Sequence, residues 1–293
     1  MDSEALARLR LFAAIEGGSV PWTRLISELG AEAVVELIEE SNPRTSSVNI
    51  GSIKSRLAAS SASELISEVE RAGAFFLLPT DPDWPTQLND LAASPIGLMV
   101  KGNRSSLSRL SNSLAIVGTR NPSNYGSRIA SDFAFGAGDR GWSVISGGAY
   151  GIDSVAHKGA LLNEGTTCAV LASGFNQSYP AGNLGLFDEI CEEGVLISEV
   201  MPHVRAEPFR FLTRNRLIAA LSQATIVIEA AYRSGSLRTA RDAAEIFRYV
   251  FAVPGPVTSP TSEGCHRLIA ERSAELVTSI AEVFEVVSPL NVK

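Results

Sequence analysis

The chain has 293 residues, of which 45% are apolar and 19% charged, as in an ordinary globular protein long enough for one large domain and a small one. Three scattered cysteines and three histidines predict neither a disulfide framework nor a metal site, and we expect no cofactor. A net charge of −7 argues against a uniformly sticky surface for polyanions, but not against a local basic site. With no run of 18 apolar residues and no signal-peptide pattern at the start, we expect no membrane association and a cytoplasmic protein.

The first 72 residues predict a small helical domain. Apolar residues follow helical spacing over 5–14, 21–29, 31–38 and 63–72, broken by glycine, proline and serine turns. A serine-rich stretch, 45–61, joins the last two, and its Ile50, Ile53 and Leu57 indicate one more short helix. Such a bundle is either a contact module for protein or DNA, or a packing appendage.

From residue 73 the pattern changes. An apolar run at 74–78 and a second at 95–100, separated by a turn-rich link, predict one or two edge strands that lead into a larger sheet. We therefore place a domain boundary near 73 and expect a second domain over residues 73–293.

Strands and helices alternate regularly from residue 114 onward. The pattern predicts strands at 114–117, 143–146, 167–171, 195–198, 225–229 and 250–253, and helices at 126–140, 152–163, 183–191, 212–221, 236–247 and 278–285. The strands are apolar almost throughout, as expected when both faces of a sheet are covered. The fold class is therefore α/β, a doubly wound and mostly parallel sheet in three layers.

Two glycine turns follow the first two strands of this alternation. Gly118-Thr119-Arg120 ends the first strand, and Ser146-Gly147-Gly148 with Gly151 ends the second. Turns of this kind at helix N-termini offer main-chain N–H groups to an anion, and an arginine fork can hold a phosphate. A capped turn with a surface arginine is the alternative. The dinucleotide and Walker patterns are both incomplete here, so a nicotinamide, flavin or Walker-type nucleotide site is disfavoured.

Three residues near these turns have a structural and a functional interpretation. Asp153 can cap the helix that follows the second turn or contact a ligand. His157 is expected to be structural. Tyr179 lies after the third strand, where it can stack on a base or pack the loop.

Basic charge is concentrated in residues 201–248, which hold eight arginines and four acidic residues, so that the rest of the chain carries −11. Within this segment, 208–216 interleaves Phe209 and Phe211 with Arg210, Arg214, Asn215 and Arg216. Cations for phosphates and rings for bases are the combination that holds single-stranded nucleic acid. Helical spacing places Arg210 and Arg214 on one face, and we expect Arg216 to point into the crevice. The alternative is that the phenylalanines are core and the arginines solvated.

Ser234-Gly235-Ser236 follows a later strand and opens a helix, as a plain cap or as a further anion nest. No spacing in the chain matches a nucleophile with its base, so we expect a binding protein rather than an enzyme. The rival hypothesis is an enzyme or sensor for a small nucleotide in the same crevice, for which Asp153 and Glu229 are the candidate acids.

Six ordered segments carry a resemblance to a known family. These are GTRNPSNYG (118–126), SGGAYGIDSVAHKGAL (146–161), GFNQSYPAGN (174–183), FLTRNRLIAALS (211–222), EAAYRSGSLRTA (229–240) and VPGPVTSPTSEGCHRLI (253–269). Together they resemble the DprA/Smf family of DNA-processing proteins over core motifs at 114–270, with a weaker lead-in at 83–102.

The resemblance implies a Rossmann-like core that binds single-stranded DNA, forms a homodimer and loads a RecA-type recombinase in natural transformation. It implies that Arg120 is the phosphate-binding arginine and that Phe211 with 214–216 lies at the DNA pocket. It also implies a sterile-alpha-motif-like N-terminal domain. Departures are Thr119 for serine, Ala181 for a common lysine, and His266 in a Gly-Cys-Asn motif. The winged-helix tail of some members is not expected.

The residues that we expect to bind nucleic acid come from all four turns and from the arginine run. They are Gly118, Thr119, Arg120, Ser146, Gly147, Gly148, Gly151, Tyr179, Arg210, Phe211, Arg214, Asn215, Arg216, Ser234, Gly235 and Ser236.

Overall fold

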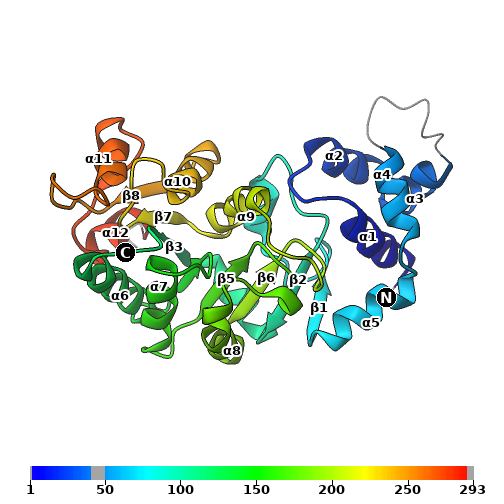
Figure 1. Cartoon of the computed structure of the whole chain (residues 1–293), viewed down its shortest axis with the longest axis horizontal. Helices are drawn as coiled ribbons and strands as arrows, with labels where there is room; N and C mark the ends of the chain where they lie inside the picture. The colour runs from blue at the N-terminus through cyan, green and yellow to red at the C-terminus, as the bar shows by residue number, and fades with distance from the viewer. Residues whose placement is uncertain (1, 41–49, 289–293) are drawn as a thin grey trace, which may run out of the picture.

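The structure, a computed structural model, describes residues 2–40 and 50–288. Its N-terminal part is helical, as predicted (Figure 1), and comprises α1 (Ser3–Ala14), α2 (Val20–Leu29), α3 (Ala31–Glu40), α4 (Ile50–Ala58) and α5 (Ala62–Arg71). A capping box fixes the start of α5, because Ser61 Oγ accepts from the Glu64 N–H while the Glu64 carboxylate accepts from the Ser61 N–H. Helix α4 confirms the short helix expected from 50, 53 and 57, whereas 45–49 lie outside the described residues.

A nine-stranded sheet forms the body of the described molecule. Its strands are β1 (Ala74–Leu77), β2 (Leu98–Gly102), β3 (Ser113–Val117), β4 (Ser143–Ser146), β5 (Thr167–Leu171), β6 (Val195–Ser198), β7 (Ala224–Val227), β8 (Tyr249–Ala252) and β9 (Glu275–Leu276). Their order in space is β1-β2-β6-β5-β4-β3-β7-β8-β9. Strand β2 pairs antiparallel with β1 and β6, and the pairs from β6 to β9 are parallel, which confirms the α/β, mostly parallel sheet.

Helices cover both faces of this sheet. They are α6 (Asn124–Gly138), α7 (Ile152–Leu161), α8 (Leu184–Glu193), α9 (Pro208–Leu221), α10 (Ser236–Glu245), α11 (Glu263–Ala270) and α12 (Ile280–Val287). Helix α9 begins four residues earlier than predicted, because Pro208 occupies its first turn, where a missing N–H costs nothing. Helix α11 and the two-residue strand β9 were not predicted.

The apolar core lies in layers on either side of the strands. Helices α9, α10 and α11 pack on one face of the sheet, and α6, α7 and α12 pack on the other. A third cluster joins α8 and the N-terminal helices to the β1 side of the sheet. In it the Phe12 and Phe76 rings meet edge to face, with centroids 5.1 Å apart. The N-terminal helices therefore share buried apolar surface with the sheet.

The chain reverses direction across the sheet at β3. After β3 it runs outward through β4, β5 and β6, then returns to lay β7 and β8 on the other side of β3. The loops that follow β3 and β7 therefore diverge at the carboxyl ends of these two strands. This is the position at which open α/β sheets bind ligands. Within the described residues, no helix has the length and apolar character needed to cross a bilayer.

Candidate nucleic-acid interface

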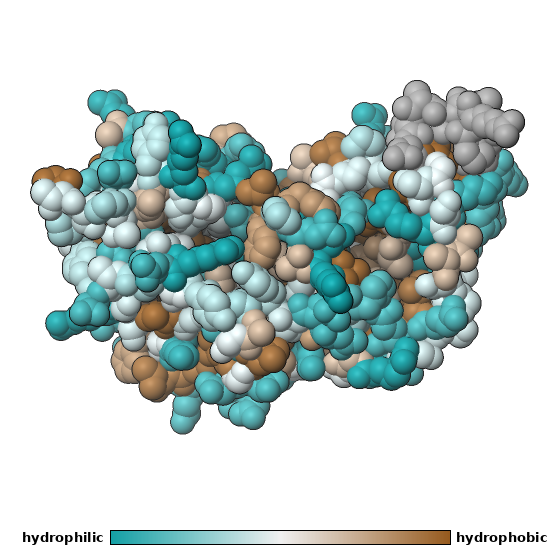
Figure 2. Space-filling model, viewed as in Figure 1, coloured by the Kyte–Doolittle hydropathy of each residue, from teal (hydrophilic) through white to brown (hydrophobic). Residues whose placement is uncertain are grey.

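A pocket of about 370 Å³ opens at this reversal point. We name it the switch pocket. Its walls are the end of β3 and the turn after it (117–120), the inner face of α9 (211–218), and the loop after β7 with the start of α10 (231–239); Ala149 and the candidate acid Asp153 also line it. Figure 2 shows apolar side chains gathered over α9 in the middle of the face it displays. The volume lies in the range of pockets that hold small ligands or a nucleotide.

The structure brings together two of the four arginines that the sequence singled out, Arg120 and Arg214, and the Phe211 ring. The Arg120 and Arg214 guanidinium carbons lie 5.3 Å and 6.0 Å from the centroid of the Phe211 ring. Tyr179, 47% exposed, meets the same ring edge to face at 5.7 Å. Two cations and two aromatic rings thus converge at one lip of the switch pocket, although Arg120 and Arg214 are separated by three strands and three helices along the chain.

Arg214 is the buried member of this group, with only 7% of its surface exposed. It donates to the carbonyl oxygens of Gly147, at 2.6 Å, and of Val170, while its Nε has no partner among the described residues. Burial is the main cause that lowers the pKa of Arg214 to about 10; the charge of Asp153 opposes the change, and the charge of Arg120 makes a smaller contribution in the same direction as burial. The guanidinium is still cationic at neutral pH. Two like charges held together attract an anion.

Arg120, in contrast, is exposed and makes no hydrogen bond or ion pair within the part of the chain that the structure describes. Its guanidinium lies against the Phe211 ring. An unpaired guanidinium beside a pocket is free to form a bidentate contact with phosphate. Arg120 therefore has the geometry that a phosphate-binding residue requires.

Asp153 corrects the prediction of a second phosphate cradle. Its carboxylate accepts from the N–H groups of Gly147 and Ala149 at 3.1 Å and 3.3 Å. Those amides are therefore already occupied, and Asp153 caps the preceding turn rather than the helix, whose N-cap is Gly151. Burial raises the pKa of Asp153, and the charge of Arg214 opposes that rise. The carboxylate serves as the internal counterion of Arg214.

Two other residues of the same turn are structural. Ser146 Oγ is fully buried and donates to the Ile116 carbonyl at 2.7 Å, and the Gly148 carbonyl accepts from Asn183 Nδ2 at 2.9 Å. Neither lines the switch pocket. Their predicted role in binding is not supported by this placement, because both groups face the interior of the protein.

Gly151 shapes the pocket without lining it. A Cβ on this residue would lie 2.4 Å from the Thr119 carbonyl oxygen and 2.7 Å from the Arg120 Cα, and its φ of +82° suits glycine. The Ile152 N–H donates to the same Thr119 carbonyl. The second glycine turn thus packs directly against the first, and this packing fixes the backbone position of Arg120.

The wall opposite Arg120 consists of Asn215 and the 234–236 turn. Asn215 is 7% exposed and donates from Nδ2 to the Gly235 carbonyl at 3.3 Å. Ser234 and Ser236 share a hydrogen bond of 2.7 Å between their hydroxyls, and the N-cap of α10 is Gly235, with no side-chain cap. Polar groups therefore line this wall, but the Ser234 N–H already donates to the Ala231 carbonyl and the Ser236 N–H to Ser234 Oγ, so an anion nest at this turn stays a prediction.

Arg216 does not point into the crevice, and that prediction is wrong. Its guanidinium donates to both oxygens of Glu199, one at 2.6 Å, and to the Ala93 carbonyl at 2.7 Å. Arg210 also lies outside the switch pocket, where it donates to Glu16 at 2.7 Å and to the Arg205 carbonyl. Both arginines lie on the side of α9 that faces the N-terminal part of the chain, where Arg210 meets Glu16 and Arg216 lies beside Gly18. That Arg210 and Arg216 bind nucleic acid stays a prediction that this placement does not favour.

Glu229, the second candidate acid, is 3% exposed and does not line the switch pocket. Its carboxylate accepts from the Ser123 N–H and hydroxyl at 2.9 Å and 2.6 Å and from Thr261 Oγ1 at 3.2 Å. Its carbonyl accepts from the Thr119 N–H. This residue holds three loops together, which is a structural use of a buried carboxylate.

His157 is also structural, as predicted. It is fully buried, with Nδ1 2.7 Å from Thr167 Oγ1. Burial, and to a smaller extent the charge of Arg214, lowers the pKa of His157 to about 3. The imidazole is therefore neutral in the folded protein at physiological pH.

Among the polar residues that line the pocket, sequence reasoning missed two, Arg233 and Thr239. Arg233 is exposed and makes no hydrogen bond or ion pair to another described residue. The signal was present, because Arg233 directly precedes the Ser-Gly-Ser turn that was singled out. Thr239 is nearly buried on the first turns of α10, and nothing in the motif distinguished it.

Comparison with known proteins identifies the family to which the chain belongs. The chain matches the family model of DNA recombination-mediator protein A over residues 75–288. It is 43% identical over 228 residues to a DprA-type DNA processing protein of Mycobacterium tuberculosis, covering 74% of this chain and 58% of that protein. It is 38% identical over 219 residues to the DNA processing protein DprA of Streptococcus pneumoniae, covering 75% and 76%. The matched region thus spans little more than half of the M. tuberculosis relative.

Solved structures extend the similarity. The X-ray structure of S. pneumoniae DprA matches with a TM-score of 0.82 and 31% identity, over 98% of each chain. A Helicobacter pylori DNA processing protein A, whose structure was determined for its single-stranded DNA binding mode, matches with a TM-score of 0.66 and 26% identity over 74% of this chain and 97% of that one. From the family model, these identities and the shared fold, we conclude that the chain belongs to the DNA recombination-mediator protein A family, the DprA/Smf family of DNA-processing proteins.

Proposed function

We propose that the chain binds single-stranded DNA in the switch pocket and acts by binding rather than by catalysis. The H. pylori relative binds single-stranded DNA, and the polar walls and glycine turns of the pocket suit a polynucleotide backbone.

One observation carries the proposal. Arg120 and Arg214 converge on the Phe211 ring at the pocket lip, and only the buried guanidinium has a counterion at hand, Asp153. A phosphate beside Arg120 would neutralise the remaining charge, while a base could stack on the exposed aromatic surface of Phe211 and Tyr179. Each such base stack contributes about 1–3 kcal/mol and tolerates any sequence.

Fluorescence anisotropy with matched single-stranded and double-stranded oligonucleotides at several salt concentrations tests this proposal. We expect preference for the single strand, little dependence on sequence, and an affinity that falls linearly with the logarithm of the salt concentration. Equal affinity for both forms, or no binding to either, would refute the proposal.

Membership in the family supports a finer proposal, in which the protein protects incoming single strands, loads a RecA-type recombinase onto them in natural transformation, and works in the cytoplasm. A strand-exchange assay tests it: the protein should shorten the lag of a RecA-type recombinase on DNA coated with single-strand-binding protein. An unchanged lag would contradict the loading role.

We also propose that the chain is a homodimer and that residues 1–72 and 73–293 are its two domains. Exposed apolar side chains beside the β9 edge support dimerisation, because Phe247 is 96% exposed and Tyr249 and Leu276 are 50% and 51% exposed. Light scattering of the purified protein measures its mass. A monomer at all concentrations would contradict the dimer.

A further inference from the structure

The loop after β7 carries an aromatic ring just outside the switch pocket. Tyr232 lies between two residues that line the pocket, Ala231 and Arg233, and its side chain is 52% exposed. The Arg267 guanidinium carbon, from α11, lies 4.7 Å from the centroid of the Tyr232 ring. Contact with a single guanidinium leaves much of the ring open to solvent.

Backbone hydrogen bonds fix the loop that carries Tyr232 against α11, the helix that carries Arg267. The Gly264 N–H, in the first turn of α11, donates to the Ala230 carbonyl at 2.8 Å, and the Ala230 N–H donates to the Thr261 carbonyl at 2.7 Å. The two segments are so close that a Cβ on Gly264 would lie 2.7 Å from the Ala230 oxygen. Arg267 follows one helical turn after Gly264, so the position of its side chain beside Tyr232 is built into the fold.

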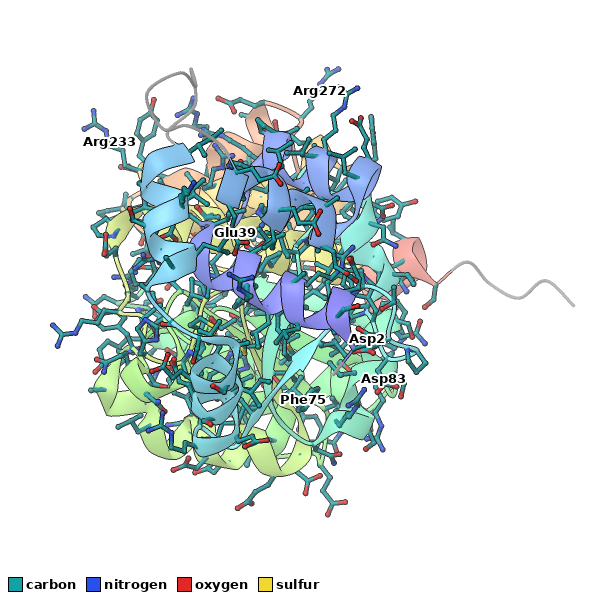
Figure 3. The ribbon with its side chains drawn as sticks, turned by 90° about the vertical axis from the view of Figure 1, so that its right-hand side faces the viewer. Asp2, Glu39, Phe75, Asp83, Arg233 and Arg272 are labelled. Carbon is teal, nitrogen blue, oxygen red and sulfur yellow. The ribbon has the colours of Figure 1, made fainter. Side chains whose placement is uncertain are left out.

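Arg233 adds a free cation at the same place. It makes no hydrogen bond or ion pair with any residue in 2–40 or 50–288, and its side chain projects away from the body of the protein (Figure 3). Arg267 pairs with Glu271 at 2.6 Å, so its charge is partly neutralised and its main contribution here is the contact with the ring. The lip thus combines one stacking surface with one unpaired guanidinium.

The opposite side of the pocket offers a strand a poorer path. There Phe209 is 44% exposed, but the arginine that covers its ring, Arg210, is held by Glu16 and Glu207. The Glu16 and Glu207 side chains are 39% and 55% exposed. Exposed carboxylates repel a polyanion. Glu271, whose side chain is 45% exposed, does so on the Tyr232 side as well, but there Arg233 adds a cation that has no carboxylate partner among the described residues.

We propose that Tyr232 and Arg233, with Tyr232 braced by Arg267, form a second nucleic-acid subsite that receives the strand as it leaves the switch pocket toward α11. The ring stacks on one base and Arg233 binds the adjoining phosphate. This inference rests on the proposed function and adds to it the direction in which the strand leaves the pocket.

Binding measurements with oligothymidylates of two lengths test the subsite, one of about 4 nucleotides, which fills little more than the pocket, and one of about 20 nucleotides. Replacement Tyr232→Ala should lower the affinity for the long oligonucleotide about 5-fold or more, as the loss of one stacked base predicts, and leave the short one unchanged. Tyr232→Phe should bind like the unmodified protein. Arg233→Gln should reduce the salt slope for the long oligonucleotide by about one.

Arg128→Ala is the matched control, since Arg128 is an exposed arginine that faces a carboxylate, Asp132, four residues further along its helix, as Arg267 does. It should change neither affinity. If Tyr232→Ala binds both lengths normally, or loses both equally, while Arg120→Ala still weakens binding, the subsite is refuted and the switch pocket stands. If the unmodified protein binds neither length, the proposed function itself fails.

Discussion

Helix α9 presents arginines of one short motif to two different surroundings. On its pocket side, Arg214 reaches inward to main-chain carbonyls and lies near Arg120. On the side of α9 that faces the N-terminal part of the chain, Arg210 and Arg216 pair with the carboxylates of Glu16 and Glu199 at 2.7 Å or less. Burial raises the pKa of Glu199, and the charge of Arg216 opposes that rise. The residue type is the same throughout, and the position of the nearest carboxylate decides what each arginine can do.

The comparison separates cations that bind the protein from cations that can bind a ligand. An arginine that already has a carboxylate must give it up to receive a phosphate, so the net gain is small. Arg120 has no such partner among the described residues. Within 201–248, the exposed Arg205, Arg233 and Arg241 also lack a side-chain partner among the described residues, but of these three only Arg233 lines the switch pocket. The switch pocket therefore combines two such unpaired arginines, Arg120 and Arg233, with the buried Arg214.

The largest expected effect concerns the buried side of the comparison. Arg214→Met leaves the Asp153 carboxylate buried without its counterion, so we expect a loss of about 3–5 kcal/mol in the free energy of unfolding. Urea denaturation measures it. The double replacement Arg214→Met with Asp153→Asn should recover part of the loss. A loss below about 1 kcal/mol would show that the pair is not a unit.

The buried surroundings of Arg214 also predict that the stability of the protein depends on pH. His157, near Arg214, has a folded pKa of about 3, below the unfolded value of about 6.5. Its contribution to stability is therefore fully present above pH 6.5 and is lost as the pH falls toward 3, with a slope of up to about 1.4 kcal/mol per pH unit.

Urea denaturation of the native protein and of His157→Gln between pH 7 and pH 4.5 would isolate this contribution. The difference in unfolding free energy between the two proteins should change with pH in that interval. A constant difference would show that His157 does not resist protonation.

The next largest effect is expected on DNA binding, at Arg120, which has no carboxylate partner among the described residues. Arg120→Ala should weaken binding to single-stranded DNA by about 1–3 kcal/mol, the scale of a charged hydrogen bond, and leave the unfolding free energy within about 0.5 kcal/mol. Anisotropy and urea denaturation measure the two quantities. Arg128→Ala serves as the control for the loss of one surface charge. Unchanged affinity would remove Arg120 from the site.

The smallest effect is expected at Arg210. Arg210→Ala breaks the pair with Glu16, which should cost about 0.2–1 kcal/mol of stability, while affinity for DNA stays close to that of the Arg128→Ala control. The sequence placed Arg210 in the DNA track, so the outcome decides between the motif and the pairing. A loss of affinity as large as that of Arg120→Ala would show that a carboxylate partner does not keep an arginine from binding DNA.

Most of the sheet could be predicted from the sequence because its strands are short, apolar and buried on both faces. All of the strands expected from residue 114 onward are present within one or two residues. Helix α11 was missed because it follows a proline-rich and serine-rich loop and has only two turns, and β9 because two exposed residues leave no periodic pattern. Short elements are set by their tertiary neighbours rather than by their own sequence.

The site could be predicted where the chemistry is local and not where it depends on distant partners. The glycine turn, Arg120 and Phe211 all lie at ends of elements that could be recognised. The positions of Arg210 and Arg216 depend on Glu16 and Glu199, 194 and 17 residues away, and the amides of the second turn are occupied by Asp153. Sequence periodicity predicts which residues share one face of a helix, but not which charged residue of another element faces them.

Glu229 ties the loops at 119, 123 and 261 to one another through its carbonyl and its carboxylate. A Cβ on Gly126 would lie only 2.2 Å from a carboxylate oxygen of Glu229, so these loops are packed too closely to accept a side chain there. The rim of the pocket is thus preformed, and a strand can settle on it without first waiting for a loop to close. Capture should then proceed at a rate governed by diffusion and ionic strength, and release should occur by peeling from one end rather than by the opening of a gate.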